Sequence, residues 1–254
     1  MENVPFLTRT ASLFYDALLT LLYPQSCAVC GESVEERGLG IACAKCWNVT
    51  RTFTREDTTC WKCGALSLGS VASEKREEVR CRRCDEQVFT LARACGSYEG
   101  ALRVSVLALK REPHISERLS TLLVGTQRQT PLNRATRIIP VPLHTQREKA
   151  RGFNQATVIG RELARSARLP LDEVSLRRTV HSERHRAGLD ANGRRQTVET
   201  AFVVRCPRLI EDESILLVDD VFTTGATVSS CAAALIAAGA KEVLVLTIAR
   251  VSYI

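Results

Sequence analysis

The stretch Ser214–Thr227, with the sequence SILLVDDVFTTGAT, decides the fold. Its first part, Ile215 to Val218, is a continuous apolar run, which is typical of a strand buried on both faces of a parallel sheet. Two carboxylates follow, Asp219 and Asp220, and then a turn of small residues precedes an alanine-rich helix. This order predicts a ligand-binding loop at the carboxyl edge of an α/β sheet.

The turn and the acidic pair suit different parts of one ligand. At a helix start the free backbone N–H groups and the helix dipole favour an anion, so a phosphate is expected at Thr223, Thr224, Gly225, Ala226 and Thr227. Because Asp219 and Asp220 would repel phosphate, we expect them to face sugar hydroxyls or a metal. The segment thus predicts a site for a phosphorylated ribose. An ordinary strand-to-helix turn is the alternative, and the missing lysine excludes a Walker-type loop.

This segment resembles the phosphoribosyl pyrophosphate (PRPP) signature of type I phosphoribosyltransferases, two acids and a TTGAT-like loop after a hydrophobic strand. The resemblance implies a phosphoribosyltransferase-like parallel sheet flanked by helices. It also implies that Asp219 and Asp220 hold the ribose 2′- and 3′-hydroxyls and that Thr223 to Thr227 hold the 5′-phosphate. Magnesium is expected to accompany the pyrophosphate, since this cation prefers phosphate oxygens and water to an all-protein cage.

Eight of the eleven cysteines form four C-x-x-C pairs. Two pairs complete a tetrahedral all-thiolate zinc site, so the chain is expected to hold two structural zinc ions. The predicted ligands are Cys27, Cys30, Cys43, Cys46, Cys60, Cys63, Cys81 and Cys84. Consecutive ribbons over residues 25–88 are the simplest arrangement, and the spacing alone leaves interleaved pairing open. A disulfide framework, a thioredoxin-like redox pair and iron–sulfur ligation are weaker alternatives.

The 254 residues have room for about two domains. The apolar stretch Leu13 to Tyr23 carries Asp16, is too short to span a bilayer and lacks a signal-peptide cleavage site. Its helical spacing predicts an N-terminal docking helix within residues 1–24, with a membrane-surface segment as the alternative. Residues 25–88 are expected to form the double zinc ribbon and residues 89–254 the phosphoribosyltransferase-like domain of a cytoplasmic protein with no transmembrane segment.

Strands and helices alternate in the predicted domain. Strands are expected at Phe89–Tyr98, Arg137–Val141, Ile215–Val218 and Val243–Ile248. Apolar spacing predicts helices around Leu102 to Leu109, around Ile115 to Leu123 and over Phe153–Arg168. Such alternation favours a parallel sheet covered on both faces, with ligands at its carboxyl edge.

The positive charge is concentrated in the second half of the chain. Residues 1–95 hold 12 basic and 12 acidic side chains, so the net charge of +7 belongs to residues 96–254. The basic segment 134–195 alone has 14 Arg or Lys against 6 Asp or Glu. This segment could neutralise PRPP, bind a nucleic-acid backbone or be a solvated face, and charge alone does not separate the three.

Two further motifs narrow the resemblance. The motif IPVPLH at 139–144, followed by RGFNQA from Arg151, occurs in order with LLVDDVFTTGAT and the N-terminal cysteine pairs. Together they resemble the ComF family of competence-associated, phosphoribosyltransferase-like proteins, from about Leu18 to Arg250. The resemblance implies a pyrophosphate-side loop containing Pro142, Leu143, His144, Arg147, Arg151, Gly152, Asn154 and Gln155. It also implies that Arg178 to Thr200 form the mobile loop that closes over PRPP in related enzymes.

The mobile-loop segment departs from the family pattern as we know it. Arg186 stands where a Gln precedes Ala-Gly-Leu, and Thr197 and Thr200 lie where an Asn is usual. His181 and His185 are acid–base candidates by their ordinary pKa values, and solvated loop histidines are the more common alternative. No catalytic residue is assigned.

The sequence supports two functions. The first is an enzyme that transfers phosphoribosyl from PRPP to an unknown nucleophile and releases pyrophosphate. The second, which the family resemblance implies, is a binding module that assists the handling of single-stranded DNA in natural transformation, with competence-machinery proteins as further partners. The scarcity of aromatic residues weakens a stacking-type DNA site. The oligomeric state and the acceptor are not readable from the sequence.

Overall fold

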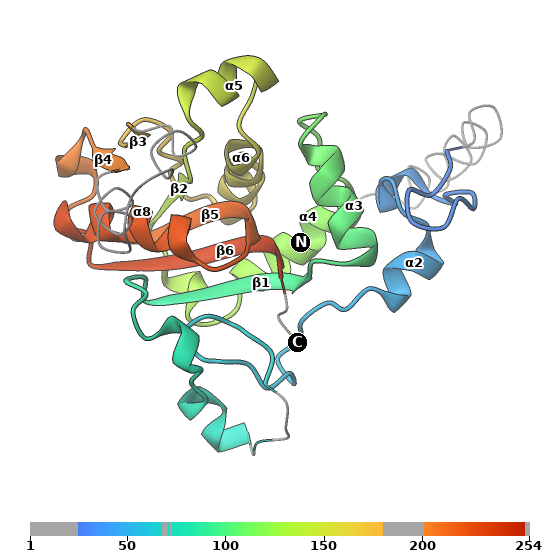
Figure 1. Cartoon of the computed structure of the whole chain (residues 1–254), viewed down its shortest axis with the longest axis horizontal. Coiled ribbons are helices and arrows are strands. Elements are labelled where there is room, and N and C mark those ends of the chain that lie inside the picture. Colours follow the sequence, from blue (N-terminus) through green and yellow to red (C-terminus); the bar gives the residue numbers. More distant parts are fainter. Residues whose placement is uncertain (1–24, 68–70, 72, 180–200, 252–254) are drawn as a thin grey trace, which may run out of the picture.

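The computed structural model describes residues 25–67, 71, 73–179 and 201–251. At its centre is a parallel sheet of four strands in the order β1-β6-β5-β2 (Figure 1). The strands are β1 (Leu91–Ser97), β2 (Arg137–Pro140), β5 (Ser214–Phe222) and β6 (Glu242–Arg250). The interior strands β5 and β6 are buried along most of their length, as their apolar runs require. The predicted parallel α/β sheet is confirmed.

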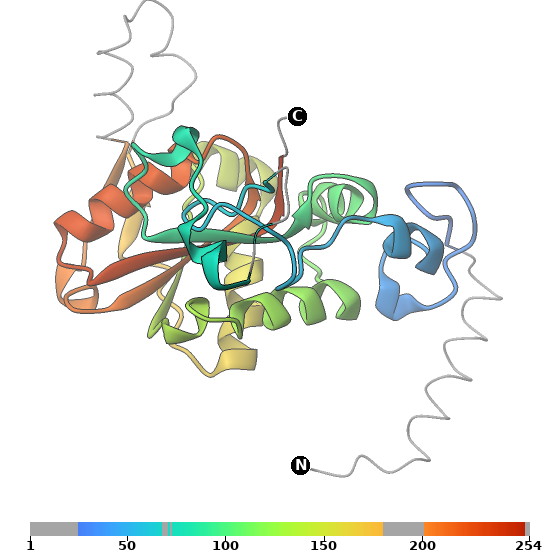
Figure 2. The ribbon, with the colours of Figure 1, turned by 90° about the horizontal axis from the view of Figure 1, so that it is seen from below.

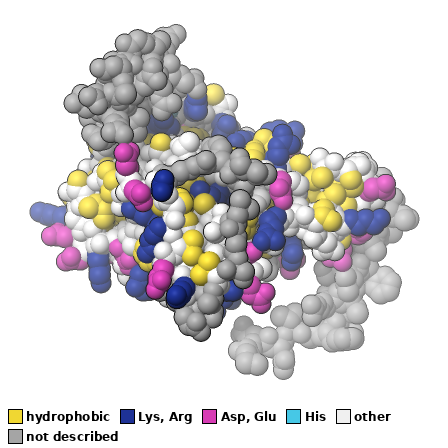
Figure 3. Space-filling model, turned by 60° about the horizontal axis from the view of Figure 1, so that its bottom comes forward, with side chains coloured by type: hydrophobic (Ala, Val, Ile, Leu, Met, Phe, Trp, Pro, Cys, Tyr) yellow, Lys and Arg dark blue, Asp and Glu magenta, His cyan; other side chains and the backbone are white. Residues whose placement is uncertain are grey.

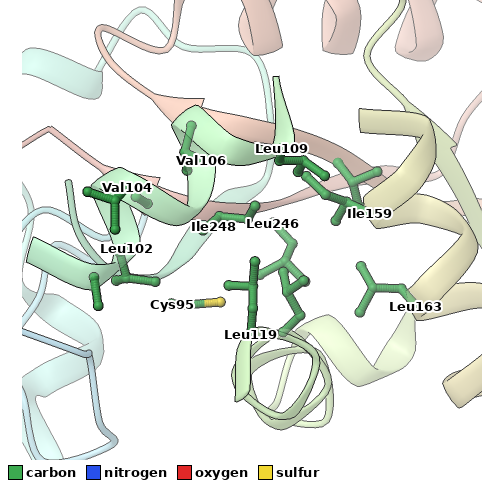
Figure 4. Close-up of a cluster of buried hydrophobic side chains, with 14 of the residues drawn as sticks. Cys95, Leu102, Val104, Val106, Leu109, Leu119, Ile159, Leu163, Leu246 and Ile248 are labelled. Atoms are coloured by element: carbon green, nitrogen blue, oxygen red, sulfur yellow. The ribbon is translucent and has the colours of Figure 1, made fainter. Parts of the chain in front are cut away.

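Helices cover both faces of the sheet (Figures 1 and 2). On one face α3 (Gly100–Leu109) and α4 (Glu117–Gln127) pack on β6, and α6 (Gln155–Ala167) packs on β5 and β2, with Leu246 and Ile248 of β6 in the same cluster. Figure 4 shows Leu102, Leu109, Leu119, Ile159 and Leu163 converging from these helices on the two strand residues. On the other face α8 (Ala226–Ala237) packs on Val243 and Val245. The helices expected from the apolar spacing are therefore present.

Several elements were not predicted from the sequence. Two short helices are present: α2 (Ala44–Val49) contains Cys46 of the first ribbon, and α5 (Thr145–Arg151) follows β2. The antiparallel pair β3 (Leu176–Arg178) and β4 (Phe202–Val204) brackets the expected mobile loop. Single turns of 3₁₀ helix complete the list: η1 (Arg37–Leu39), η2 (Ser73–Glu78), η3 (Arg82–Cys84), η4 (Leu132–Arg134) and η5 (Pro207–Leu209).

The two zinc ribbons pack at different places (Figure 2). The first continues into α2, whose last turn is joined to α3 by the Thr50 hydroxyl, which accepts a hydrogen bond from the Ala101 N–H at 2.8 Å. The second lies against β1, where the Ala92 N–H donates to the Lys62 carbonyl at 2.7 Å. Cysteines of each ribbon belong to a hydrophobic cluster that also contains sheet residues. Residues on both sides of the expected domain boundary between 88 and 89 therefore share hydrophobic clusters.

The expected docking helix at 1–24 and most of the expected mobile loop, including His181 and His185, lie outside the described residues. Within the described ranges no helix is long and apolar enough to cross a membrane.

Candidate metal centres and phosphoribosyl site

The eight paired cysteines form two clusters of four thiols. Within each cluster the sulfur atoms all lie within 4.8 Å of one another. One cluster comprises Cys27, Cys30, Cys43 and Cys46, and the other Cys60, Cys63, Cys81 and Cys84. The pairing is therefore consecutive and not interleaved. The thiols are free, and four of them at this separation form the tetrahedral donor set of a structural zinc site, as predicted.

Backbone N–H groups support both donor sets. The Cys43 N–H donates to the Cys27 sulfur at 3.3 Å, and the Cys81 N–H donates to the Cys60 sulfur at the same distance. Such outer hydrogen bonds orient metal-bound thiolates and stabilise their charge. A glycine with positive φ follows one pair in each ribbon, Gly31 at 82° and Gly64 at 70°, so that the chain can turn around the metal.

The register of β2 and β5 brings the two predicted ligand loops to one edge of the sheet. The strands are adjacent and parallel, and Pro140 pairs with Val218. The chain leaves β2 immediately after Pro140, while β5 continues through the acidic pair to Phe222. Asp219 and Asp220 are therefore the end of a strand and not the start of a turn. Their side chains and the segment after β2 lie at the same carboxyl edge, where α/β proteins bind ligands.

The acidic pair is electrostatically asymmetric. Burial, with a contribution from the neighbouring Asp220, raises the pKa of Asp219 to about 8, although its carboxylate accepts a hydrogen bond from the Asp220 N–H at 2.8 Å. Asp220 instead pairs with Lys110 at 3.4 Å. Lys110 and Arg178 both act against the rise in the Asp219 pKa, so two cations from separate elements lie close to the acids. Burial thus opposes a negative charge on Asp219, whereas Asp220 has Lys110 as its partner.

The turn after β5 has the geometry of an anion cradle. Gly225 is the N-cap of α8 with φ of 83°, and no side chain caps that helix start. A Cβ at Gly225 would lie 2.6 Å from the Phe222 ring, so both conformation and space exclude a side chain. Thr223, Thr224, Ala226 and Thr227 are exposed around it. The Ala226 N–H donates to the Thr224 hydroxyl at 3.4 Å, and the other N–H groups of the first turn are available to a ligand.

The predicted pyrophosphate-side residues fall into two groups. Asn154 and Gln155 are buried and serve the local structure: Asn154 bonds the Val141 carbonyl at 2.9 Å and the Ala156 N–H at 3.0 Å, capping α6. The Gln155 carbonyl oxygen accepts from Arg151 at 2.6 Å. Pro142, Leu143, His144, Arg147 and Gly152 lie on or beside α5, which separates them from the start of α6. Gly152, with φ of 83°, ends α5 before Asn154 caps α6, so the predicted loop residues are divided between two helices.

Sequence reasoning missed four residues near the acids and the cradle. Lys110 follows α3, Arg178 ends β3, Gln87 follows the second ribbon, and Arg250 ends β6. Each comes from a segment far from β5 in the sequence. Only the position of Arg250, just after the predicted strand Val243–Ile248, carried a signal, because strand ends in a parallel sheet face the ligand edge. The other three depend on packing.

Known proteins resemble both the zinc-ribbon region and the chain as a whole. The family model described as "Double zinc ribbon domain" matches residues 18–85. DNA utilization protein YhgH of Escherichia coli O157:H7 is 30% identical over 238 residues, covering 91% of this chain and 99% of that protein. Competence protein F of Haemophilus influenzae is 36% identical over 114 residues, covering 44% and 49%, and competence protein ComFC of Bacillus subtilis is 32% identical over 102 residues, covering 40% and 39%.

Two solved structures show a weaker likeness. The allosteric regulatory enzyme of purine biosynthesis has a TM-score of 0.36 at 21% identity, covering 51% of this chain and 24% of that chain. Glutamine PRPP amidotransferase from Bacillus subtilis has a TM-score of 0.37 at 20% identity, covering 51% and 25%. At these scores neither likeness carries an argument about function.

The fold and the cysteine clusters define the class, a double-zinc-ribbon protein built on a parallel α/β sheet with an acid-tipped strand and a glycine turn. The predicted class is confirmed. Within it, the chain belongs to the ComF family, whose members include DNA utilization protein YhgH and the competence proteins F and ComFC.

Proposed function

We propose that this protein binds PRPP at the carboxyl edge of β5 and β2 and transfers its phosphoribosyl group to a nucleophile. The observation that carries the proposal is the register of these strands, with Pro140 opposite Val218. It sets the acidic pair and the glycine turn beside the segment after β2. A ligand with a phosphate at one end and a pyrophosphate at the other requires that juxtaposition of two anion-binding loops around hydroxyl acceptors.

Each part of PRPP has a candidate partner. The 5′-phosphate takes the N–H groups of Thr223 to Thr227, and the ribose hydroxyls take Asp219 and Asp220. The pyrophosphate takes the segment from Pro142 to Gly152, with Arg147 and Arg151 as its cations. Magnesium bound with the pyrophosphate would supply charge neutralisation for the leaving group.

The proposed reaction depends on positioning the two substrates and stabilising charge in the transition state, and it needs no covalent intermediate with the protein. The nucleophile forms a bond to the anomeric carbon, and the carbon–oxygen bond to pyrophosphate breaks with its electron pair on the leaving group. The sugar gains oxocarbenium character between the two events. The Asp220 carboxylate beside the ribose would stabilise that positive charge, and its pair with Lys110 at 3.4 Å holds it in place. Arg178 sets the base of the 178–200 segment beside Asp219, which is where a closing loop would exclude water.

The proposed phosphoribosyl transfer is tested by measuring product formation. The protein is incubated with PRPP, magnesium and a metabolite extract, and pyrophosphate and new phosphoribosylated masses are measured. We expect PRPP-dependent products that disappear with the Asp219→Asn, Asp220→Asn double variant. Binding of PRPP without any product or pyrophosphate would contradict turnover and leave a PRPP-regulated binding module.

The names of the relatives favour a second candidate, a role in handling single-stranded DNA during natural transformation. The basic segment 134–195 could contact phosphates. On the face shown in Figure 3, Lys and Arg are interspersed with Asp and Glu, so the described residues of this particular face form no uniformly basic patch. Salt-dependent binding of a fluorescent single-stranded oligonucleotide, compared between the parent and Arg147→Gln, Arg151→Gln, tests whether one surface serves both ligands. Binding by the parent that these changes leave unaltered would separate the DNA surface from the pyrophosphate loop. A cytoplasmic location stays a prediction.

A further inference from the structure

The second zinc ribbon touches the glycine turn directly. Gln87, three residues after the last ligand Cys84, reaches the turn with its side chain: Gln87 Oε1 lies 3.1 Å from where a Cβ on Gly225 would stand. The same segment is fastened to α8, because the Val88 N–H donates to the Ser229 hydroxyl at 3.0 Å. Phe89 then packs edge-on against Phe222, with ring centroids 5.9 Å apart. Three consecutive residues just after the second ribbon's last ligand thus contact the turn, its helix and its strand.

Gln87 has unused hydrogen-bonding capacity at this contact. Its Oε1 is buried and has no hydrogen-bond partner among the described residues. A buried amide oxygen without a donor is costly, and a half-turn about the last side-chain bond would present the amide N–H₂ group instead. A cavity of about 490 Å³ opens between Gln87, Cys63 and Cys84 on the ribbon side and Thr223 and Thr224 on the turn side. A donor there suits an anion held by the turn.

Arg250 connects the same turn to a zinc ligand. Its guanidinium donates to the Cys63 carbonyl at 2.5 Å and approaches the Cys63 sulfur at 3.6 Å. It also stacks over the Phe222 ring, 4.6 Å from the centroid. That ring supports Gly225 from below, at 2.6 Å from its would-be Cβ. The arginine is therefore a direct link between the metal centre and the floor of the turn.

The charge of Arg250 requires an anion. The side chain is only 8% exposed, and in the described part of the chain no carboxylate forms an ion pair with it. Buried charges are found paired or at metal sites. Zinc with four thiolates carries a net charge of minus two, and the Cys60/Cys63/Cys81/Cys84 cluster supplies it 3.6 Å away. The residues therefore fit a zinc-loaded second ribbon.

We propose that the second ribbon is a working part of the phosphate site: Gln87 donates a hydrogen bond to the anion held by the glycine turn, and Arg250 is a positioning residue that couples zinc at Cys63 to that turn. The proposal rests on the proposed function, that residues 223–227 bind phosphate. It assigns the two ribbons different roles, since nothing comparable joins the first ribbon to the turn among the described residues.

The test uses full-length, zinc-loaded protein and ribose 5-phosphate as the probe, with PRPP in a parallel titration. We expect Gln87→Ala and Arg250→Gln each to weaken binding at least threefold. The matched control is Arg118→Gln, which removes an arginine stacked at 5.8 Å over Trp47 of the first ribbon. That variant should bind like the parent. Circular dichroism and zinc content check that each variant is folded and loaded.

A second readout separates coupling from ordinary destabilisation. Cobalt replaces zinc, and its thiolate absorption bands are recorded with and without ribose 5-phosphate. We expect the probe to shift the bands in the parent and in Arg118→Gln, and the shift to vanish in Arg250→Gln. Parent-like affinity in Gln87→Ala, or an unchanged shift in Arg250→Gln, would overturn the corresponding half of the proposal. Failure of the parent to bind either ligand would instead refute the proposed phosphate site itself.

Discussion

Replacing Asp219 with Asn should stabilise the protein at alkaline pH and have little effect in acid. Asn is isosteric and can still accept the 2.8 Å hydrogen bond from the Asp220 N–H. It cannot ionise. The comparison of parent and variant therefore isolates the cost of placing a negative charge at position 219, where burial and Asp220 oppose it.

The sign and size follow from the pKa. The folded-state pKa of Asp219 is about 8 and the ordinary value is 3.8, so between these values the folded state keeps a proton that the unfolded state loses. Stability is highest below the unfolded pKa and falls as pH rises towards the folded pKa. The difference between these two pKa values corresponds to at most about 5 kcal/mol of folding free energy. Because Asp219 is partly exposed to solvent, we expect about 2 kcal/mol.

Urea unfolding of both proteins at several pH values between 4.5 and 8.5, followed by circular dichroism, measures the effect. The free energy of unfolding of Asp219→Asn minus that of the parent should increase by about 2 kcal/mol across this range. Titration of other groups cancels in the difference. A difference that is constant with pH, or that falls as pH rises, would refute the buried, neutral Asp219.

Three other predictions follow from the same geometry. Cys27→Ser should release about one of two zinc ions and leave the Cys60/Cys63/Cys81/Cys84 site loaded, as measured by elemental analysis, and loss of both ions would contradict independent sites. The Arg147→Gln, Arg151→Gln variant should bind pyrophosphate more weakly and with a smaller salt dependence. An unchanged salt dependence would mean that these arginines do not contact the anion. Thr50→Ala should lower the free energy of unfolding by about 1 to 3 kcal/mol, because the Ala101 N–H loses its acceptor; Thr121→Ala on the exposed face of α4 is the control, and equal effects would count against this link.

The sequence predicted the elements whose residues carry strong local signals. The apolar runs of β5 and β6, the spacing of the four cysteine pairs and the glycine at the start of α8 each correspond to what the structure contains. These features depend on neighbours along the chain. Gly225 lies in the predicted anion loop, and its φ of 83° is a conformation that glycine adopts readily; a side chain there would contact Phe222 first.

Features that depend on packing between distant segments were missed. The short helix α5 has no apolar face and no buried residue, so the spacing of apolar residues does not predict it. The Lys110–Asp220 pair joins the end of α3 to the end of β5, and the contact of Gln87 with Gly225 joins the second ribbon to α8. We expected residues 25–88 to form a domain of their own, whereas Cys60, Cys63 and Cys84 share a hydrophobic cluster with Phe222 and Val228.

Calorimetric titration of PRPP with magnesium into the parent and the Asp219→Asn, Asp220→Asn variant tests the phosphoribosyl site most directly. A hydrogen bond to a charged acceptor contributes about 1.5 to 3 kcal/mol and one to a neutral acceptor about 0.5 to 1.5 kcal/mol. Because the pKa of Asp219 is raised to about 8, the variant should keep its fold and lose about 1.5 kcal/mol or more of binding free energy. Gly225→Val should abolish binding, since its Cβ would lie 2.6 Å from Phe222 and its backbone would need φ of 83°. A parent that binds PRPP with variants that bind it equally tightly would contradict the site, and with it the phosphoribosyltransferase function.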